Sequence, residues 1–199
     1  MKILLLSPHT DDVELGAGGS IIRFIEEKHK IFWIIFSSKN SLSKEFKNVI
    51  SNLGLSEKEF IIYDYRIRYL YKHRQEILEK LVKIKSFFQP DLVLTPSLND
   101  YHQDHQIVSN EVVRAFKTSC SILGYELPWN HLSFDSIFFI RLNKNHVEKK
   151  YDLLLNYKSQ LMKKKCYFSR ESVFGLAKVR GNQCNSVYAE AFEVIRWII

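Results

Sequence analysis

The stretch from Ile3 to Gly19 reads ILLLSPHTDDVELGAGG and decides the fold. The apolar run 3–6 predicts a buried strand, and a helix is expected over 16–27. Between them lies a polar loop that contains one histidine and two aspartates. A buried strand, a polar loop and a helix in this order are typical of a βαβ unit.

The same alternation of short apolar runs and longer helical patterns continues along the chain. Further strands are expected at 31–36, 60–63, 92–95, 121–125 and 136–141, and further helices at 44–53, 71–88, 104–116 and 147–157. This alternation predicts a Rossmann-like α/β fold, with a mostly parallel sheet and helices on both faces. The chain contains no linker or repeat, so we expect a single domain over residues 1–199.

Polar clusters follow the first and the fourth of the expected strands. In the common doubly wound order these two strands lie side by side, where the strand order reverses. The clusters are therefore expected to meet at one edge of the sheet. Their charged and titratable members are His9, Asp11, Asp12, Asp100, His102, Asp104 and His105.

Histidines and aspartates in this arrangement indicate a metal site. Zinc binds imidazole nitrogen and carboxylate oxygen, and catalytic zinc sites use three protein ligands. The spacing leaves open which two of His9, Asp11 and Asp12 bind the metal. A His-x-Asp-Asp loop is also typical of an ordinary turn or helix cap, but two such rare clusters at neighbouring strand ends favour the metal site.

The run Gly16-Ala17-Gly18-Gly19 does not indicate a dinucleotide-binding loop, because it lacks the G-x-G-x-x-G spacing. The second strand also runs into Ser37 and Ser38 instead of an acidic residue that would bind a ribose. We expect these glycines to let the start of a helix approach the sheet and the metal loop closely.

Five segments together resemble the LmbE/PIG-L family of zinc-dependent N-acetyl-sugar deacetylases. They are 9–12 (HTDD), 16–19 (GAGG), 102–105 (HQDH), 157–160 (YKSQ) and 188–192 (YAEAF). The chain departs from the family pattern at Thr10, Val13 and Gln103, where the family often has proline, glutamate and proline. These departures remove no ligand and no base, and they leave the substrate open.

The resemblance implies a role for each residue of the two histidine motifs. It implies that His9, Asp12 and His105 bind zinc, with another divalent ion such as Fe²⁺ also compatible with such a site. It implies that Asp11 is the general base. It implies that His102 stabilises the oxyanion or protonates the leaving amine.

Two further expectations concern the carboxylates of the second cluster. The resemblance implies that Asp104 orients a histidine. We also expect Asp104 or Asp100 to lie near His102 and to raise its pKa, since a carboxylate favours the imidazolium form. A protonated His102 would then act together with the metal on the developing oxyanion.

Three residues outside the motifs are candidates for substrate binding. Arg68 follows the third strand, at a position where the family often has an arginine that can bind a hydroxyl or a phosphate. Asn130 and His131 follow the fifth strand, in a region that family members use for substrate contact. For Arg68 a surface or ion-pairing role, and for His131 an ordinary turn, are the alternatives.

The charge and the cysteine content limit the partners that the protein can bind and the compartment in which it can lie. The formal net charge is +7, and much of the excess lies in a lysine-rich tract over 144–170. Such a tract favours an anionic substrate, such as a nucleotide sugar or a phosphorylated glycan, or else forms a solvated helix face. Three scattered cysteines without a C-x-x-C pair, and no secretion signal, favour the cytoplasm. The longest apolar runs are too short to span a membrane.

The predicted activity is removal of an acetyl group from a small N-acetylated sugar or sugar conjugate, with zinc as cofactor. One alternative is a zinc amidase that acts on a substrate other than a sugar. Others are a metal-binding module without turnover and a basic nucleic-acid-binding module. No arrangement of arginines and aromatic residues favours a specific nucleic-acid partner.

Overall fold

The computed structural model describes residues 1–38 and 40–199. Its strands are β1 (Lys2–His9), β2 (Lys30–Ser37), β3 (Phe60–Ile62), β4 (Leu92–Pro96), β5 (Ser121–Tyr125), β6 (Phe138–Leu142) and β7 (Tyr188–Arg196). They form one mixed sheet in the order β3-β2-β1-β4-β5-β7-β6. The first five strands of that order run parallel, whereas β7 is antiparallel to both β5 and β6.

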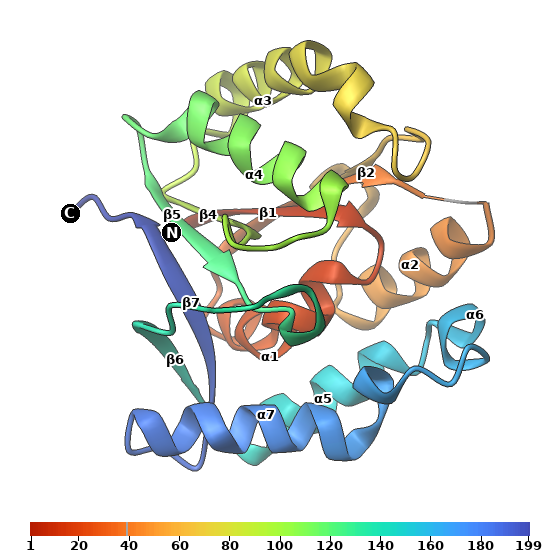
Figure 1. The fold of residues 1–199 in the computed structure, drawn as a ribbon, viewed down its shortest axis with the longest axis vertical. Coiled ribbons are helices and arrows are strands. Elements are labelled where there is room, and N and C mark those ends of the chain that lie inside the picture. The colour runs from red at the N-terminus through yellow and green to blue at the C-terminus, as the bar shows by residue number, and fades with distance from the viewer. Residues whose placement is uncertain (39) are drawn as a thin grey trace.

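Helices cover both faces of this sheet. They are α1 (Asp12–Glu26), α2 (Asn40–Asn52), α3 (Arg74–Phe88), α4 (Gln103–Phe116), α5 (Lys144–Leu154), α6 (Lys158–Leu161) and α7 (Arg170–Gln183). Figure 1 shows α3 and α4 on one face and α1, α2, α5 and α7 on the other. A separate cluster of buried apolar residues lies under each group, so the predicted Rossmann-like α/β fold is confirmed. Within the described residues no helix is long and apolar enough to cross a membrane.

β1 lies in the middle of the sheet, between β2 and β4. Ile3, Leu4 and Leu5 pair in register with residues 92–94 of β4. These three side chains are fully buried, because helices cover the strand from both sides. The predicted adjacency of the first and fourth strands is therefore confirmed, and the loops after β1 and β4 leave the sheet at the same edge.

The glycine cluster lies inside α1 and not at its start, which corrects the expected helix boundary. The helix already begins at Asp12, and its backbone departs from helical geometry at Ala17. A Cβ atom on Gly16 would lie 2.5 Å from Cδ2 of Tyr125, and one on Gly19 would lie 2.5 Å from Cδ1 of Leu142. The glycines thus let α1 pack closely against the sheet at β5 and β6, as expected.

The part of the chain after β5 contains two features that the sequence pattern does not predict. No helix is expected over 170–183, where the structure has α7, capped by a hydrogen bond from the backbone N–H of Ser172 to Oγ of Ser169. Gly175 and Gly181 lie within this helix and weaken its intrinsic propensity. The last strand, β7, inserts between β5 and β6, a long-range pairing that local patterns do not determine.

Candidate metal centre and active site

Two loops meet at the edge of the sheet where β1 and β4 end. The first carries His9 as the last residue of β1, Asp11 at the cap of α1 and Asp12 at the first position of that helix. The second carries His102 at the cap of α4 and His105 in the first turn. Each helix thus starts at the edge of the sheet where the preceding strand ends, and this brings five polar side chains to one place.

Three donor atoms form a nearly equilateral triangle. His9 Nδ1 lies 3.1 Å from Oδ2 of Asp12, and His105 Nε2 lies 3.2 Å from the same oxygen. The two ring nitrogens are 3.3 Å apart. Ligands at about 2.0–2.2 Å from a tetrahedral zinc ion lie roughly 3.3–3.6 Å from one another. The donor set and its spacing therefore fit a divalent transition-metal ion.

A carboxylate holds the far nitrogen of each histidine in this triangle. Oδ2 of Asp100 lies 2.7 Å from Nδ1 of His105, and Oδ2 of Asp104 lies 3.1 Å from Nε2 of His9. If these nitrogens carry the protons, His105 presents Nε2 and His9 presents Nδ1 as the free donors. Such carboxylate–histidine pairs orient the ligands in metal sites. The sequence predicts that Asp100 belongs to the cluster, but it does not predict the contact with His105.

A third histidine lies beside the triangle. One ligand atom from each of His9, His102 and His105 lies within 4.8 Å of the others. The triangle that includes Asp12 is more compact, with edges of 3.1–3.3 Å. In addition, Nδ1 of His102 already accepts a hydrogen bond from a backbone N–H at 3.2 Å. The geometry thus favours Asp12, and not His102, as the third ligand.

The triangle attracts positive charge. Burial opposes the charged form of both rings, yet the Asp12 carboxylate and its neighbours raise the pKa of His9 to about 10 and that of His105 to about 9. Burial likewise opposes ionisation of Asp12, but the two histidines hold the pKa of that carboxyl well below its usual range. A position that binds protons this strongly also suits a cation.

Asp11 and His102 lie at the same cavity as the triangle and take no part in it. Withdrawal from water and the adjacent Asp12 carboxylate raise the pKa of Asp11 to about 6. Asp11 makes no side-chain hydrogen bond to the N-terminus of α1, so its carboxylate is not used as a helix cap. A carboxylate of this kind, next to a metal ligand, is suited to accept a proton from water.

The expected rise in the pKa of His102 is wrong. Burial and the neighbouring rings of His105 and His9 lower its pKa to about 4. The two carboxylates expected near it, Asp100 and Asp104, are engaged with those other rings. His102 is therefore neutral, and because Nδ1 accepts a backbone N–H, the proton resides on Nε2.

The cavity above the triangle has a volume of about 880 Å³, and two of the three candidate substrate residues line it. Arg68 comes from the loop after β3, and its backbone N–H donates to Oδ2 of Asp104 at 2.6 Å. Asn130 donates from Nδ2 to Oδ2 of Asp100 at 3.2 Å. Both residues thus connect the substrate space to the carboxylates that hold the histidine rings.

The third candidate, His131, does not line this cavity among the described residues. Its Nε2 accepts the backbone N–H of Leu127 at 3.1 Å, and its Nδ1 lies 3.1 Å from the carbonyl oxygen of Asn99. Both ring nitrogens are therefore used to hold the loop. The structure supports the alternative reading of His131 as part of a turn.

One buried group beneath the first loop is not predicted from the sequence. The hydroxyl of Tyr157 donates to the carbonyl oxygen of Thr10 at 2.5 Å and also contacts the carboxyl group of Glu14. Burial raises the pKa of Glu14 well above its usual range, which favours the neutral form of this carboxyl. Tyr157 thereby fixes the backbone just before Asp11, which explains why an aromatic residue so late in the chain belongs to the site.

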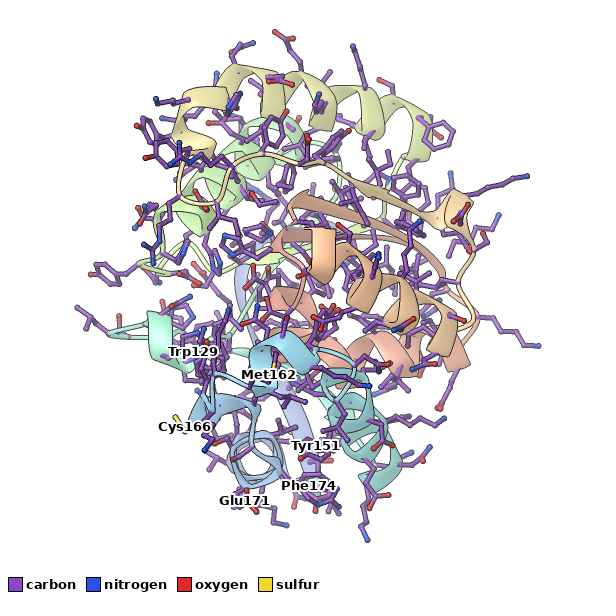
Figure 2. The ribbon with its side chains drawn as sticks, turned by 90° about the vertical axis from the view of Figure 1, so that its right-hand side faces the viewer. Trp129, Tyr151, Met162, Cys166, Glu171 and Phe174 are labelled. Carbon is purple, nitrogen blue, oxygen red and sulfur yellow. The ribbon has the colours of Figure 1, made fainter. Side chains whose placement is uncertain are left out.

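Residues after β5 also line the cavity. The rings of Trp129 and Tyr167 stack with centroids 3.8 Å apart and an interplanar angle of 12°. Gln160, Lys163 and Lys165 line the same cavity. Figure 2 shows Trp129 near Met162 and Cys166, in the lower half of that view.

Comparison with known proteins identifies the family. A family model described as PIG-L, GlcNAc-PI de-N-acetylase, matches residues 4–116, which is more than half of the chain and includes both histidine loops. The protein called uncharacterized deacetylase YaiS from Escherichia coli (strain K12) is 29% identical over 167 residues. That alignment covers 79% of this chain and 90% of the relative.

Solved structures share the fold. N,N'-diacetylchitobiose deacetylase from Pyrococcus horikoshii has 17% identity and a TM-score of 0.78, over 98% of this chain and 83% of that one. The 4-carboxy-2-hydroxymuconate hydratase GalB from Pseudomonas putida KT2440 has 19% identity and a TM-score of 0.77, over 100% and 97% of the two chains. At these identities the likeness shows the fold alone, and the fold carries more than one chemistry. By the family match, which includes both histidine loops, the chain belongs to the PIG-L (LmbE-like) family of de-N-acetylases, as the resemblance of its motifs predicts.

Proposed function

We propose that this protein is a zinc-dependent N-deacetylase that hydrolyses the acetamide of an N-acetylated sugar or sugar conjugate. The observation that carries the proposal is the compact triangle of His9, Asp12 and His105, with Asp11 and His102 at the same cavity. A site that only stores a metal has no need of a neighbouring base and a neutral histidine donor. Their presence favours turnover.

His9, Asp12 and His105 would hold the ion in this proposal. A bound divalent ion supplies Lewis acidity, which lowers the pKa of water from about 15.7 to about 7. Asp11 accepts the proton that water loses as it attacks the acetamide carbonyl carbon. When the C–N bond breaks, Asp11 returns this proton to the leaving nitrogen, so the products are acetate and the free amino sugar.

His102 acts as a hydrogen-bond donor in this proposal. Its pKa, lowered to about 4, keeps the ring neutral at physiological pH, with the proton on Nε2. A neutral donor stabilises the developing oxyanion without giving up its proton, and such donors are typically worth about 2.7–4 kcal/mol. This assigns proton delivery to Asp11 and oxyanion binding to His102.

The sugar and the compartment are the finer parts of the proposal. The family and the names of several similar proteins concern deacetylation, and one structural neighbour acts on diacetylchitobiose. The cavity volume of about 880 Å³ suits a substrate of one or two sugar rings. A cytoplasmic location is supported by the free thiols of Cys120, Cys166 and Cys184.

Acetate release tests the proposal. The purified chain would be depleted of metal with a chelator, reloaded with Zn²⁺ or Fe²⁺, and given N-acetylated sugars and matched non-sugar acetamides. We expect acetate from the sugars, loss of activity on chelation and recovery on adding Zn²⁺. Equal rates on both substrate groups would instead support a general amidase. No acetate from any acetamide, with the metal fully bound, would contradict the deacetylase.

A further inference from the structure

Four basic side chains from two separate segments of the chain line the active-site cavity. Arg66 and Arg68 come from the loop after β3, and Lys163 and Lys165 come from the segment after α6. We call these four residues the cavity cations. They are all exposed to solvent, and they surround the space that opens above the histidine triangle.

The side chains of the cavity cations form no ion pair among the described residues, unlike three lysines of the same tract. Lys149 lies 2.7 Å from Glu26, and Lys150 lies 2.7 Å from Glu190. Lys144 is likewise paired, 3.6 Å from Glu148. Among the described residues, no carboxylate oxygen lies within 4.0 Å of a side-chain nitrogen of a cavity cation, although the charge of Lys165 acts on Asp11 and opposes the rise in its pKa.

The contacts that the cavity cations do make are with neutral groups. Nζ of Lys163 donates to Oε1 of Gln160 at 2.8 Å. The guanidinium of Arg66 lies 4.0 Å from the ring centroid of Tyr69, and Nζ of Lys165 lies 5.2 Å from that of Tyr167. These contacts position the cations without neutralising them.

Two local backbone conformations support this arrangement. Lys164 has φ of 50° and Arg68 has φ of 69°, in the left-handed region that residues other than glycine rarely adopt. At Lys164 the turn directs the residues on either side of it into the cavity, while Lys164 itself is not among the residues that line it. Such backbone conformations cluster at ligand-binding sites.

The charge balance of the cavity calls for an anion. A divalent ion would add two positive charges to those of the four cavity cations. Against these stand Asp11, Asp12 and Asp64, which line the cavity, and the buried Asp100 and Asp104 behind the histidine rings. A positive excess remains, and it lies at the cavity surface. A phosphate or diphosphate group matches this excess better than a single carboxylate, because it brings more charge and more acceptor oxygens.

We propose that the cavity cations recognise a phosphate group on the sugar substrate, so that the protein acts on a sugar phosphate or a sugar linked through a diphosphate. This inference rests on the proposed deacetylase function, since it assigns the metal end of the cavity to the acetamide. The cavity cations bind the phosphate, and the acetamide lies at the histidine triangle of the same cavity.

The test compares ligands that differ only in the phosphate. Metal-loaded protein would be titrated by calorimetry with glucosamine 1-phosphate and with glucosamine, so that binding is measured without turnover. KM for acetate release would be measured with the corresponding N-acetylated sugars. The variants are Lys165→Ala, the double variant Lys163→Ala/Lys165→Ala, and Lys158→Ala as a matched control. Lys158 is an exposed lysine of the same tract that does not line the cavity.

We expect the parent protein to bind the phosphate ligand about tenfold more tightly than glucosamine, and the double variant to lose most of this preference. Lys158→Ala should change the affinity by less than about twofold, because this lysine does not line the cavity and its exposed charge is screened. Equal affinity for the two ligands, or an equal loss in Lys158→Ala and Lys165→Ala, would overturn the proposal.

The remaining outcomes separate the two proposals. Selective phosphate binding without cleavage of any acetamide would contradict the deacetylase and support the phosphate site. Acetamide cleavage without a preference for phosphate would support the deacetylase and overturn the phosphate site. Muramic acid, an amino sugar without the acetyl group that carries a carboxylate, serves as a third ligand. If this sugar binds as tightly as glucosamine 1-phosphate, the cavity cations recognise a carboxylate as well as a phosphate, and the proposal is overturned.

Discussion

The chain before β5 and the chain from β5 onward contribute differently to the site. The earlier part alternates strands and helices, and its two strand ends supply the three donor atoms together with Asp11 and His102. The later part turns antiparallel at β7 and supplies the stacked pair Trp129–Tyr167 and two of the cavity cations. Chemistry thus comes from the parallel strands, whereas the shape and charge of the cavity come largely from later segments.

The two parts are joined by hydrogen bonds between a buried ion pair of the later part and the backbone of α1. Nζ of Lys150 donates to Oε1 of Glu190 and to the carbonyl oxygen of Leu15, each at 2.7 Å. Glu190 also accepts the backbone N–H groups of Gly19 and Ser20. The later part therefore attaches to α1, the helix that starts at the metal loop. Changes to the two histidine loops should affect metal content and kcat/KM, whereas changes in the later part should affect stability and substrate binding.

The largest expected effect is loss of the metal in His105→Ala. Removing one of three ligands should leave little metal after dialysis, and kcat/KM should fall by more than the roughly 100-fold typical of changes to groups that only support a ligand. Elemental analysis per chain and acetate release measure both. His131→Ala is the control, and it should retain the metal. A parent-like metal content in His105→Ala would show that the triangle is not the site.

Asp11→Asn should separate the base from the metal. The metal content should stay near that of the parent, while kcat/KM falls by about 10²- to 10⁴-fold. The base works when ionised, and the pKa of Asp11 is raised to about 6 before any cation lowers it. Activity of the parent should therefore decline as the pH falls through values at or below 6. This decline should be absent from the residual activity of the variant, and an unchanged pH profile would assign it to another group.

Asp100→Asn should weaken the metal without removing a ligand. The carboxylate that lies 2.7 Å from Nδ1 of His105 loses its charge, and metal affinity should fall about 10- to 100-fold. Competition with a chelator measures the affinity. Asp91→Asn is a matched control, because Asp91 bonds the backbone of Lys2 at the opposite end of the strands. An equal effect of both variants would indicate general destabilisation.

Glu190→Ala should affect stability and spare the chemistry. Removing this buried partner leaves Lys150 uncompensated, so the free energy of unfolding should fall by about 3–5 kcal/mol. Urea denaturation measures the change, and kcat of the folded protein should stay near that of the parent. Glu148→Ala breaks only exposed pairs and should cost at most about 1 kcal/mol. Similar losses in both variants would contradict the role given to burial.

Much of the fold and of the metal triangle follows from the sequence, because local patterns determine them. The apolar runs define β1 and β4, and the doubly wound order predicts that they are neighbours. His9, Asp12 and His105 meet because each lies within a few residues of a strand end or helix start. Spacing alone did not choose Asp12 over Asp11; the resemblance suggested it, and the distances favour it.

The rest depends on contacts between segments far apart in the chain. The neutral state of His102 follows from which ring each carboxylate contacts, and only the folded arrangement determines this. The same holds for Tyr157 beneath Thr10 and for the insertion of β7 beside β5. Likewise, only the folded structure determines which residues of the lysine-rich tract form ion pairs and which do not.

The contacts of Asp104 couple the affinity for the ion to the affinity for the substrate. Its Oδ2 contacts Nε2 of His9 and also accepts the backbone N–H of Arg68, so one oxygen serves a metal ligand and the substrate wall. A ligand that shifts the loop at Arg68 alters the support of His9, and an ion that orders His9 alters the loop. Cation affinity and substrate affinity are therefore linked, and by reciprocity each changes the other by the same factor. The affinity for the substrate should accordingly differ between the protein with and without its ion, even where the substrate does not touch the ion.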